Sequence, residues 1–599
     1  MERRRLFLGV ERSALGRAWR DRLDDVARAQ ALAITQQHGL PDILSRILAG
    51  RGVAPETVDA FLEPTIREAM PDPSVLTDMD RAVERLAKAV IDGEQVAIFG
   101  DYDVDGATSS AVLTLFLRAA GLDPFVHIPD RIFEGYGPNT EALKTLAGRG
   151  ATLLVTLDCG TTSHQVLGEA ARLGLDVVVC DHHQADEVLP SVEAVVNPNR
   201  LDDLSGLGQL CAAGVTFMLV VALNRHLRGK GFWTTARPEP DLMRYVDLVA
   251  LGTVADVVPL TGLNRAFVAR GLAVMRRREN AGLRALMDVA RLDGPPAPYH
   301  LGFLLGPRIN AGGRIGDAAL GLRLLITDDT LEAGRIAADL DRLNRERQVV
   351  EMGTVAEAEA EALASLGPDE EGASVIVTAG NGWHAGVVGL VASRLKERFK
   401  RPAFAVAFTG DTGTGSGRSI AGVDLGAAVR KAVAAGILAK GGGHAMAAGI
   451  TVERGQLAEF RAYLEETLGN AVEKARRDEA LLVDAATTAG ALTHDLVATI
   501  DRAGPFGSGN PEPVLALPAH VIAHVDELSG THMRARLRSG DGRQVEAMAF
   551  RAAGQPLGAM LTAHRGKPLH LAGTASINRW QGQERVQFRI LDAAVPPTV

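Results

Sequence analysis

Three carboxylates at alternate positions follow a short apolar run near residue 100 and could bind a metal ion. The run is Val96–Phe99, and Asp101, Asp103 and Asp105 come directly after it in the sequence GDYDVDG. Carboxylates packed this closely repel one another, and hard divalent cations with oxygen ligands would relieve that repulsion. For this motif alone, a polar turn in which an aspartate caps the following helix is the plainer alternative.

Three later apolar runs also end in residues that bind metals. These residues are Asp158, the triplet Asp181-His182-His183, and Asp256. If the runs that precede Asp101, Asp158 and Asp181 are parallel strands, their carboxyl ends meet at one edge of a sheet, where open α/β sheets bind ligands. Carboxylates that bridge two ions, together with one or two imidazoles, are typical of a two-metal site for attack on phosphorus.

Taken together, the motifs resemble the DHH phosphoesterases, and specifically the RecJ-type single-stranded-DNA exonucleases. The similar segments are DYDVDG, LDCGT, DHH, GTVAD, GPRINAGGR, WHAGVVG, SGRS, GGGHAMAAG and PFGSGNPEP, and the likeness runs from about Leu40 to nearly the last residue. The resemblance implies an exonuclease that hydrolyses single-stranded DNA in the 5′→3′ direction to mononucleotides, in DNA repair and recombination.

The resemblance also implies two divalent ions, Mg²⁺ or Mn²⁺, and roles for the acidic cluster. Asp101 and Asp103 would hold one ion, Asp158 would bridge, and the second ion would be held by Asp105, His182 and Asp256. His183 would contact the phosphate or a bridging water, and Asp181 would orient the neighbouring histidine. The implied catalytic residues are Asp103, Asp105, Asp158, His182 and His183. Many members of the wider superfamily have a histidine at the position of Phe99, and Asp101 would take over its role here.

Several polar residues lie among glycines, where a backbone can approach a ligand closely. Arg131 follows an apolar run and would, by resemblance, contact the 5′ end; a solvated loop arginine is the alternative. The stretch 306–314 suits contacts to a phosphodiester, with a glycine-rich linker as the alternative. We expect loops at 413–419 and 441–444, and structural histidines are the alternative there. The candidates for substrate binding are Arg131, Arg308, Asn310, Arg314, His384, Ser416, Arg418 and His444.

The order of apolar and helical patterns predicts an α/β protein of several domains. Residues 1–80 indicate short helices that pack against the first catalytic strand or line an approach to the site. Residues 81–316 alternate strand and helix, as in a parallel, doubly wound sheet. One long connecting helix is predicted at 317–366, and a second α/β unit, which resembles the DHH-associated (DHHA1) domain, at 367–475. Strand-like runs at 480–599 predict a separately folding β-barrel, an oligonucleotide-binding (OB) fold by resemblance.

Charge is distributed unevenly along the chain. The net charge is −9, but from Thr531 to Val599 there are ten Arg or Lys and four Asp or Glu, so this part carries +6 and the remainder −15. Arg534, Arg536 and Arg538 alternate and would share one face of a strand. With Trp580 as a stacking surface, they suit binding of single strands without regard to sequence.

The remaining composition indicates an ordinary cytoplasmic protein. The chain has 599 residues, and no apolar run approaches the roughly 20 residues that span a bilayer. The three cysteines lack metal-type spacing, so reduced thiols are expected. We expect a monomer whose partner is single-stranded DNA, without a membrane; a single-strand-binding protein and a helicase are further candidate partners.

Three other functions fit parts of the pattern. A DHH phosphodiesterase acting on short oligonucleotides or cyclic dinucleotides is the nearest enzymatic alternative, but it needs no basic barrel and is usually far shorter. A non-catalytic single-strand-binding protein on a DHH scaffold should have lost metal ligands, and every expected acid and histidine is present here. A class II pyrophosphatase is disfavoured by the basic module.

Overall fold

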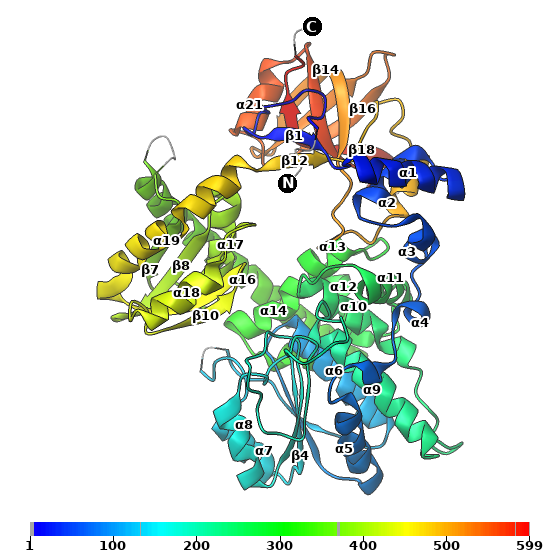
Figure 1. The fold of residues 1–599 in the computed structure, drawn as a ribbon, viewed down its shortest axis with the longest axis vertical. Helices are drawn as coiled ribbons and strands as arrows, with labels where there is room; N and C mark the ends of the chain where they lie inside the picture. The colour runs from blue at the N-terminus through cyan, green and yellow to red at the C-terminus, as the bar shows by residue number, and fades with distance from the viewer. Residues whose placement is uncertain (1–4, 132, 368–371, 581–582, 598–599) are drawn as a thin grey trace.

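A computed structural model describes residues 5–131, 133–367, 372–580 and 583–597. Figure 1 shows an α/β lobe at the bottom, a second α/β lobe on the left and a β-barrel at the top. The long helix α16 (Thr330–Leu366) leads from the first lobe to the second, and α19 (Leu457–Arg477) leads from the second toward the barrel. The predicted fold class is confirmed, whereas the exact domain boundaries stay predictions.

The first lobe contains the predicted parallel sheet. Its strands are β2 (Val96–Gly100), β3 (Phe125–His127), β4 (Leu153–Leu157), β5 (Asp176–Cys180) and β6 (Ala194–Val196), in the spatial order β3-β2-β4-β5-β6. Every residue of β2 and β4 is buried, as expected for strands that are covered on both faces. One face packs against α5 (Met79–Asp92), α6 (Val104–Ala119) and α9 (Ala212–Gly229). The other face packs against α7 (Thr140–Gly148) and α8 (His164–Ala170).

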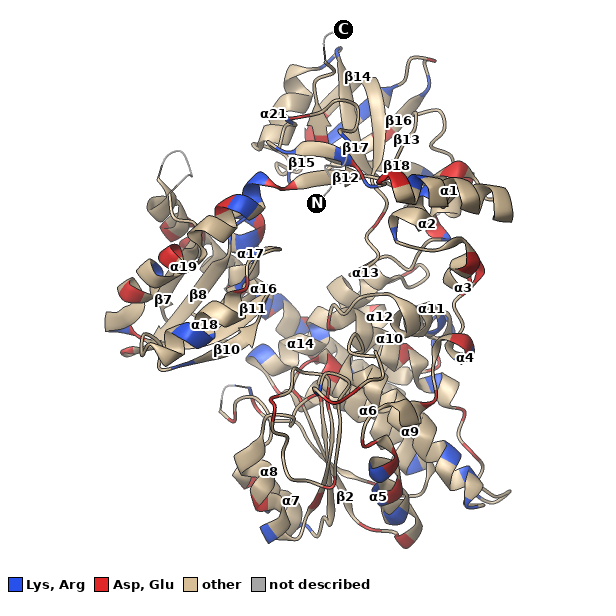
Figure 2. Cartoon of the chain, viewed as in Figure 1, with Lys and Arg blue, Asp and Glu red and all other residues tan. Residues whose placement is uncertain are grey.

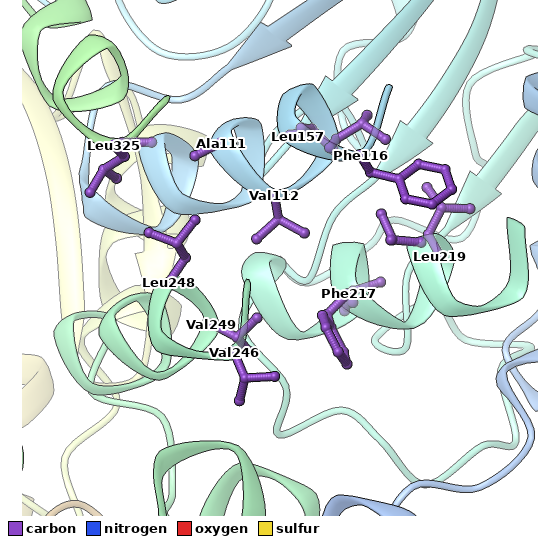
Figure 3. Close-up of a cluster of buried hydrophobic side chains, with 14 of the residues drawn as sticks. Ala111, Val112, Phe116, Leu157, Phe217, Leu219, Val246, Leu248, Val249 and Leu325 are labelled. Atoms are coloured by element: carbon purple, nitrogen blue, oxygen red, sulfur yellow. The ribbon is translucent and has the colours of Figure 1, made fainter. Parts of the chain in front are cut away.

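Helix α6 is the centre of this lobe. Figure 3 shows Val112 and Phe116 of α6 beside Phe217 of α9, with Val249 of α10 (Val246–Ala255) completing the cluster. The first residues of α6 are buried as well, because small side chains there let α9 and α10 approach. The helix that starts at the acidic motif is therefore fixed by packing along its whole length.

One prediction for residues 306–366 needs correction, and the alternative of a glycine-rich linker at 306–314 is excluded. The expected single helix at 317–366 is two helices, α15 (Ala319–Ile326) and α16, because Asp329 caps the start of α16 by accepting from the amides of Leu331 and Glu332. The glycine-rich stretch is the helix α14 (Gly306–Ile315) rather than a linker. Its glycines allow close contact: a Cβ on Gly313 would lie 2.5 Å from the carbonyl oxygen of Tyr102.

The second α/β lobe has a mixed sheet. Its strands are β7 (Ile376–Asn381), β8 (Ala403–Thr409), β9 (Thr412–Arg418), β10 (Lys440–His444) and β11 (Ala447–Glu453), in the order β10-β11-β9-β8-β7. The loops predicted at 413–419 and 441–444 were wrong, since most of these residues form β9 and β10. The glycines of β9 face the core: a Cβ on Gly417 would lie 2.4 Å from the ring of Phe404. Ser416 and Arg418 consequently point to the opposite face.

The predicted barrel is present. It consists of β14 (Leu515–Leu528), β15 (His532–Arg538), β16 (Gln544–Ala549), β17 (Pro568–Trp580) and β18 (Gln583–Ala594). The order β14-β15-β16-β18-β17 returns to β14, which closes the sheet into an OB-type barrel. Helix α21 (Pro556–Ala563) packs on β14 and β18.

The N-terminal segment packs in a place that the sequence did not predict. Strand β1 (Ala18–Asp21) pairs with β12 (Ala480–Val483), and α1 (Asp25–His38) and α2 (Asp42–Gly50) share one apolar cluster with the barrel strands. Of this segment, α5 packs on the catalytic lobe, mainly against β6 and α9 rather than the first catalytic strand. The barrel core is continuous with this segment, because Leu44 and Leu48 of α2 belong to the same apolar cluster as the barrel strands.

Two general features accompany this architecture. All three cysteines are buried and form no disulfide. In the described part of the chain, no helix has the length and apolar character needed to cross a membrane.

A buried carboxylate joins the N-terminal segment to the barrel and gives a testable prediction. Asp484 accepts from Arg22 Nε at 2.8 Å and from Arg51 Nη1 at 2.8 Å. Asp484→Ala would leave Arg51, whose side chain is 4% exposed, without its partner. We expect the free energy of unfolding in urea to fall by about 3–5 kcal/mol.

The exposed Asp25 provides the control. It pairs with Arg5 and Arg28, and its side chain is 73% exposed. Asp25→Ala should cost no more than about 1 kcal/mol. Equal losses for the two variants would contradict a structural role for Asp484.

Candidate active site

The strand-end acids meet at one edge of the catalytic sheet. Asp101 follows β2, Asp158 follows β4 and Asp181 follows β5, and all three side chains are buried. Because β2, β4 and β5 are adjacent, three carboxylates from distant parts of the sequence become neighbours. Asp158 has a left-handed backbone with φ of 63°, a conformation that costs a non-glycine residue roughly 1–2 kcal/mol and is common at functional sites.

Helices bring three further acids to the same place. Asp103 caps α6, and both carboxylate oxygens of Asp105 accept from the first amides of α9, Ala212 at 2.6 Å and Ala213 at 2.9 Å. Asp256 lies at the end of α10. α10 can approach because residue 252 is a glycine: a Cβ there would be 2.8 Å from Asp105 Oδ1.

The two histidines are held in different orientations. His182 Nδ1 lies 3.1 Å from the carbonyl oxygen of Leu210, so Nε2 points into the acidic cluster, 3.2 Å from Asp158 Oδ1. The same nitrogen is 3.7 Å from Asp256 and 3.8 Å from Asp105. His183 Nδ1 is 2.8 Å from Asp181 Oδ1, so Asp181 orients His183 rather than His182.

Sequence reasoning missed the residues that support this histidine pair. Asn199 donates to the carbonyl oxygen of His182 at 2.6 Å, and Asn197 donates to that of His183 at 2.8 Å. Tyr136 OH lies 3.2 Å from His183 Nδ1 and donates to the carbonyl oxygen of Asp158 at 3.2 Å. The only signal was the polar Asn-Pro-Asn segment directly after the last strand of the sheet.

The acidic cluster fits divalent cations. The ligand atoms fall into three groups in which all lie within 4.8 Å of one another: Asp101, Asp103 and Asp158; Asp105, His182 and Asp256; and Asp158, His182 and His183. Oδ1 of Asp101 and Oδ1 of Asp158 are buried and accept no hydrogen bond from the described residues. Buried acceptors without donors are costly, and hard cations would satisfy them. The roles of these residues as ligands stay a prediction.

Electrostatics agree with this donor set. Burial, and then the neighbouring carboxylates, raise the pKa of Asp158 well above its ordinary value, and those of Asp101 and Asp105 are raised as well. Cation binding would favour the charged forms and release protons. Asp181 differs: although burial opposes ionisation, hydrogen bonds from His183 and Thr161 lower its pKa.

Three arginines gather beside the acidic cluster. Burial, and then the positive charges of Arg131, Arg347 and Arg418, lower the pKa of Arg314 to about 10. Arg131 also lies over the ring of Tyr102, 5.0 Å from its centroid. Arg131, Arg314 and His384 line a cavity of about 150 Å³. In Figure 2, basic segments of α14 lie next to acidic segments at the strand ends. Guanidiniums held this close favour an anion between them.

The other substrate-binding candidates are only partly in this pocket. Ser416 and Arg418 face α17 (Val388–Phe399), since a Cβ on Gly389 would meet both side chains. His444 is exposed at the end of β10, and burial, then the positive charges of His183 and His182, lower its pKa. Arg308 instead forms an ion pair with Asp341 of α16, with Nη2 2.9 Å from Oδ1. Asn310 is half-buried on α14.

The barrel candidates lie on an exposed face. Arg534, Arg536 and Arg538 are exposed and alternate with buried residues of β15, although Arg534 pairs with Asp526 at 2.8 Å. Trp580 ends β17, and its side chain lies outside the described part of the structure. The aromatic ring that is exposed nearby belongs to Phe550, whereas Phe588 is in the core.

Comparison with known proteins agrees with this geometry over three segments. Residues 95–253 match the DHH family N-terminal domain, residues 372–470 the DHHA1 domain and residues 483–592 the RecJ OB domain. The fold and site thus define a phosphoesterase of the DHH class, with a DHHA1 domain and an OB barrel attached.

Individual relatives narrow this assignment. The single-stranded-DNA-specific exonuclease RecJ of Dickeya dadantii is 39% identical over 79% of this chain and 83% of its own length. That of Escherichia coli is 35% identical over 92% and 95%. The crystal structure of Thermus thermophilus RecJ in complex with Mn²⁺ aligns with a TM-score of 0.77 at 30% identity, covering 97% of this chain and 80% of that one. A second structure of that protein is in complex with Mg²⁺ (TM-score 0.73). The chain belongs to the RecJ family of single-stranded-DNA-specific exonucleases, which are hydrolases.

The Asp181–His183 pair should make the stability of the metal-free protein depend on pH. Burial opposes protonation, but the hydrogen bond to Asp181 raises the pKa of His183 from 6.5 to about 9. The pair therefore stabilises the metal-free fold fully below pH 6.5, and this contribution is lost as the pH rises through about 9.

We expect Asp181→Asn to lower the pKa of His183 toward its ordinary value, as followed by NMR titration in EDTA. The resonances of His570 in the barrel serve as an internal control, because this residue lies in another lobe. An unchanged titration of His183 in the variant would show that Asp181 does not hold it.

Proposed function

We propose that this protein removes mononucleotides from the 5′ end of single-stranded DNA with two bound Mg²⁺ or Mn²⁺ ions. The observation that carries the proposal is the position of the acidic cluster beside the arginine pocket, the cavity lined by Arg131, Arg314 and His384. The acidic cluster suits cations, and the arginine pocket suits the terminal phosphate of a DNA strand. Together they would bind a phosphodiester between them. The matched Mn²⁺- and Mg²⁺-bound relatives support the choice of ions.

Asp101 and Asp103 would hold one ion, Asp105, His182 and Asp256 the other, and Asp158 would bridge the two. Asp158 shares a group of ligand atoms with Asp101 and Asp103, and its Oδ1 lies 3.2 Å from Nε2 of His182, which shares a group with Asp105 and Asp256. When bound, the ions supply the acidity that activates a water molecule and the positive charge that stabilises the leaving 3′ oxygen. His183, oriented by Asp181, would donate to a phosphate oxygen.

The arginine pocket would set the polarity. Arg131, Ser416 and Arg418 would bind the 5′-terminal phosphate, because guanidiniums and a hydroxyl match its acceptors. Arg314 would add a further positive charge. A terminal phosphate held one nucleotide from the acidic cluster would place the first internal phosphodiester at the ions. Release of mononucleotides from the 5′ end follows from that spacing.

The barrel would bind the strand farther from the site. The exposed row of Arg534, Arg536 and Arg538 suits backbone contacts, and Phe550 adds an exposed aromatic surface. The matched RecJ OB domain disfavours a short-substrate phosphodiesterase, which needs no such module. A non-catalytic protein is disfavoured because each implied ligand is present within its group.

The first prediction concerns the bridging ligand. Asp158→Ala should abolish hydrolysis of 5′-labelled single strands in Mg²⁺ or Mn²⁺, while DNA binding stays within about threefold of the wild type, because the arginines remain in place. Digestion of 5′- and 3′-labelled strands, with EDTA as the zero-activity reference, measures both activity and direction. Near-normal turnover by the variant would rule out the bridging role, and mononucleotide release from the 3′ end would rule out the polarity.

The second prediction concerns the terminal phosphate. Arg418→Ala should lower kcat/KM on 5′-phosphorylated strands by roughly 10- to 100-fold, since a hydrogen bond to a charged group contributes about 1.5–3 kcal/mol. Strands with a 5′-hydroxyl should lose much less. Arg398→Ala is the control, because this arginine of the same lobe is exposed and pairs with Glu359. Equal losses on both strands would indicate general backbone binding instead.

A further inference from the structure

A loop of the C-terminal region contacts the catalytic lobe directly after Asp256. The loop, residues 504–510, connects α20 (His494–Asp501) to the barrel strand β14. The amide of Leu260 donates to the carbonyl oxygen of Ser508 at 2.7 Å. Only three residues separate Leu260 from Asp256, so this contact is close in sequence to the last implied metal ligand.

The loop is built to fit this place closely. Gly507 and Asn510 exchange backbone hydrogen bonds of 2.9 and 3.2 Å, which close a tight turn. The side chain of Asn510 is buried and donates to the carbonyl oxygens of Ala503 and Pro505 at 2.9 Å each. Gly509, with φ of 71°, lies against Pro259: a Cβ there would be 2.9 Å from the proline Cβ. The turn therefore has one shape, and no room for a larger residue.

The chain between Asp256 and Leu260 needs an external support. Val257 has φ of 62°, a left-handed conformation that is unfavourable for a β-branched residue and persists only where the surroundings impose it. On the catalytic side, Asn264 donates to the carbonyl oxygens of Pro259 at 3.0 Å and Gln209 at 2.7 Å. Gln209 precedes Leu210, the residue that orients His182.

A second contact joins the loop to the helix that contains Asn264. Arg265 of α11 (Gly262–Met275) is buried, donates to the carbonyl oxygens of Phe61 and Gly504, and lies 3.7 Å from the centroid of the Phe61 ring. The loop 504–510 is thus held at Gly504 by Arg265 and at Ser508 by Leu260, which lie nine and four residues after Asp256.

We propose that the loop 504–510 is a positioning element for the metal centre, through which the C-terminal region keeps Asp256 aligned for cation binding. The barrel is then more than a surface for DNA, since its connection to the catalytic lobe sets the affinity for the second ion. This inference rests on the proposed role of Asp256 as a ligand.

The test is Gly509→Ala in the full-length protein. The added methyl group would meet Pro259 and displace the turn. Gly554→Ala is the matched control: Gly554 has the same φ of 71°, and nothing lies within 4 Å of its Cβ position. We expect Mn²⁺ titration without DNA to show a loss of affinity of about 10-fold at one site for Gly509→Ala, the lower end for loss of a supporting contact, and no change for Gly554→Ala.

Two further readouts separate positioning from a general loss of structure. Hydrolysis of a short oligonucleotide by Gly509→Ala should recover at high Mn²⁺, and hydrogen exchange at the Leu260 amide should rise. If Gly509→Ala does not fold, Gly507→Ala is the milder variant, because its methyl group meets only the flexible side chain of Leu260.

Asp256→Asn distinguishes the two proposals. If this variant loses Mn²⁺ affinity while Gly509→Ala and Gly507→Ala bind Mn²⁺ as the wild type does, the positioning role of the loop is wrong and the ligand assignment stands. If Asp256→Asn itself binds Mn²⁺ normally, the ligand assignment is wrong, and the inference falls with it.

Discussion

Repulsion among carboxylates buried at one sheet edge is the constraint on which the rest of the catalytic lobe depends. Asp101 and Asp158 lie in one group of ligand atoms, Asp105 and Asp158 both approach Nε2 of His182, and all three carboxylates are buried. Their charged forms are disfavoured by burial and by each other, so the cluster needs either protons or cations. The surrounding structure tolerates this because α9 presents its amides to Asp105 and β4 ends in a strained turn at Asp158. The site is pre-organised at a cost in stability that bound cations would offset.

This constraint also explains why distant segments converge here. The cluster receives acids from the ends of β2 and β4 and from α6 and α10, and His182 from the end of β5. Packing of α6 against α9 and α10 therefore sets the distances between these side chains (Figure 3). In the second α/β lobe, Arg418 and His444 lie on the strands β9 and β10, and strands hold side chains more precisely than loops do. The loop that precedes the barrel strand β14 contacts the catalytic lobe through the hydrogen bond from the Leu260 amide to the carbonyl oxygen of Ser508.

Much of this arrangement could be predicted from the sequence, and the failures have physical reasons. Apolar runs ending in Asp101, Asp158 and Asp181 predicted the sheet and the acidic edge, because periodicity and strand polarity are local properties. Glycines misled the prediction at 413–419, since Gly417 marks a crowded strand interior rather than a loop. The docking of α2 on the barrel was missed because such contacts join residues more than 400 positions apart. The Asn197 and Asn199 contacts were missed because short polar segments after strands are common and carry no specific pattern.

The most direct test of the account is calorimetric titration of the EDTA-treated full-length chain with Mn²⁺ near pH 7, in buffers of different ionisation enthalpy. We expect two ions per chain and a net release of protons, because bound cations favour the charged forms of Asp101 and Asp158, whose pKa values burial raises well above the ordinary value. Binding of fewer than two ions, or binding without proton release, would contradict the claim that a charge-frustrated carboxylate cluster forms a two-metal centre.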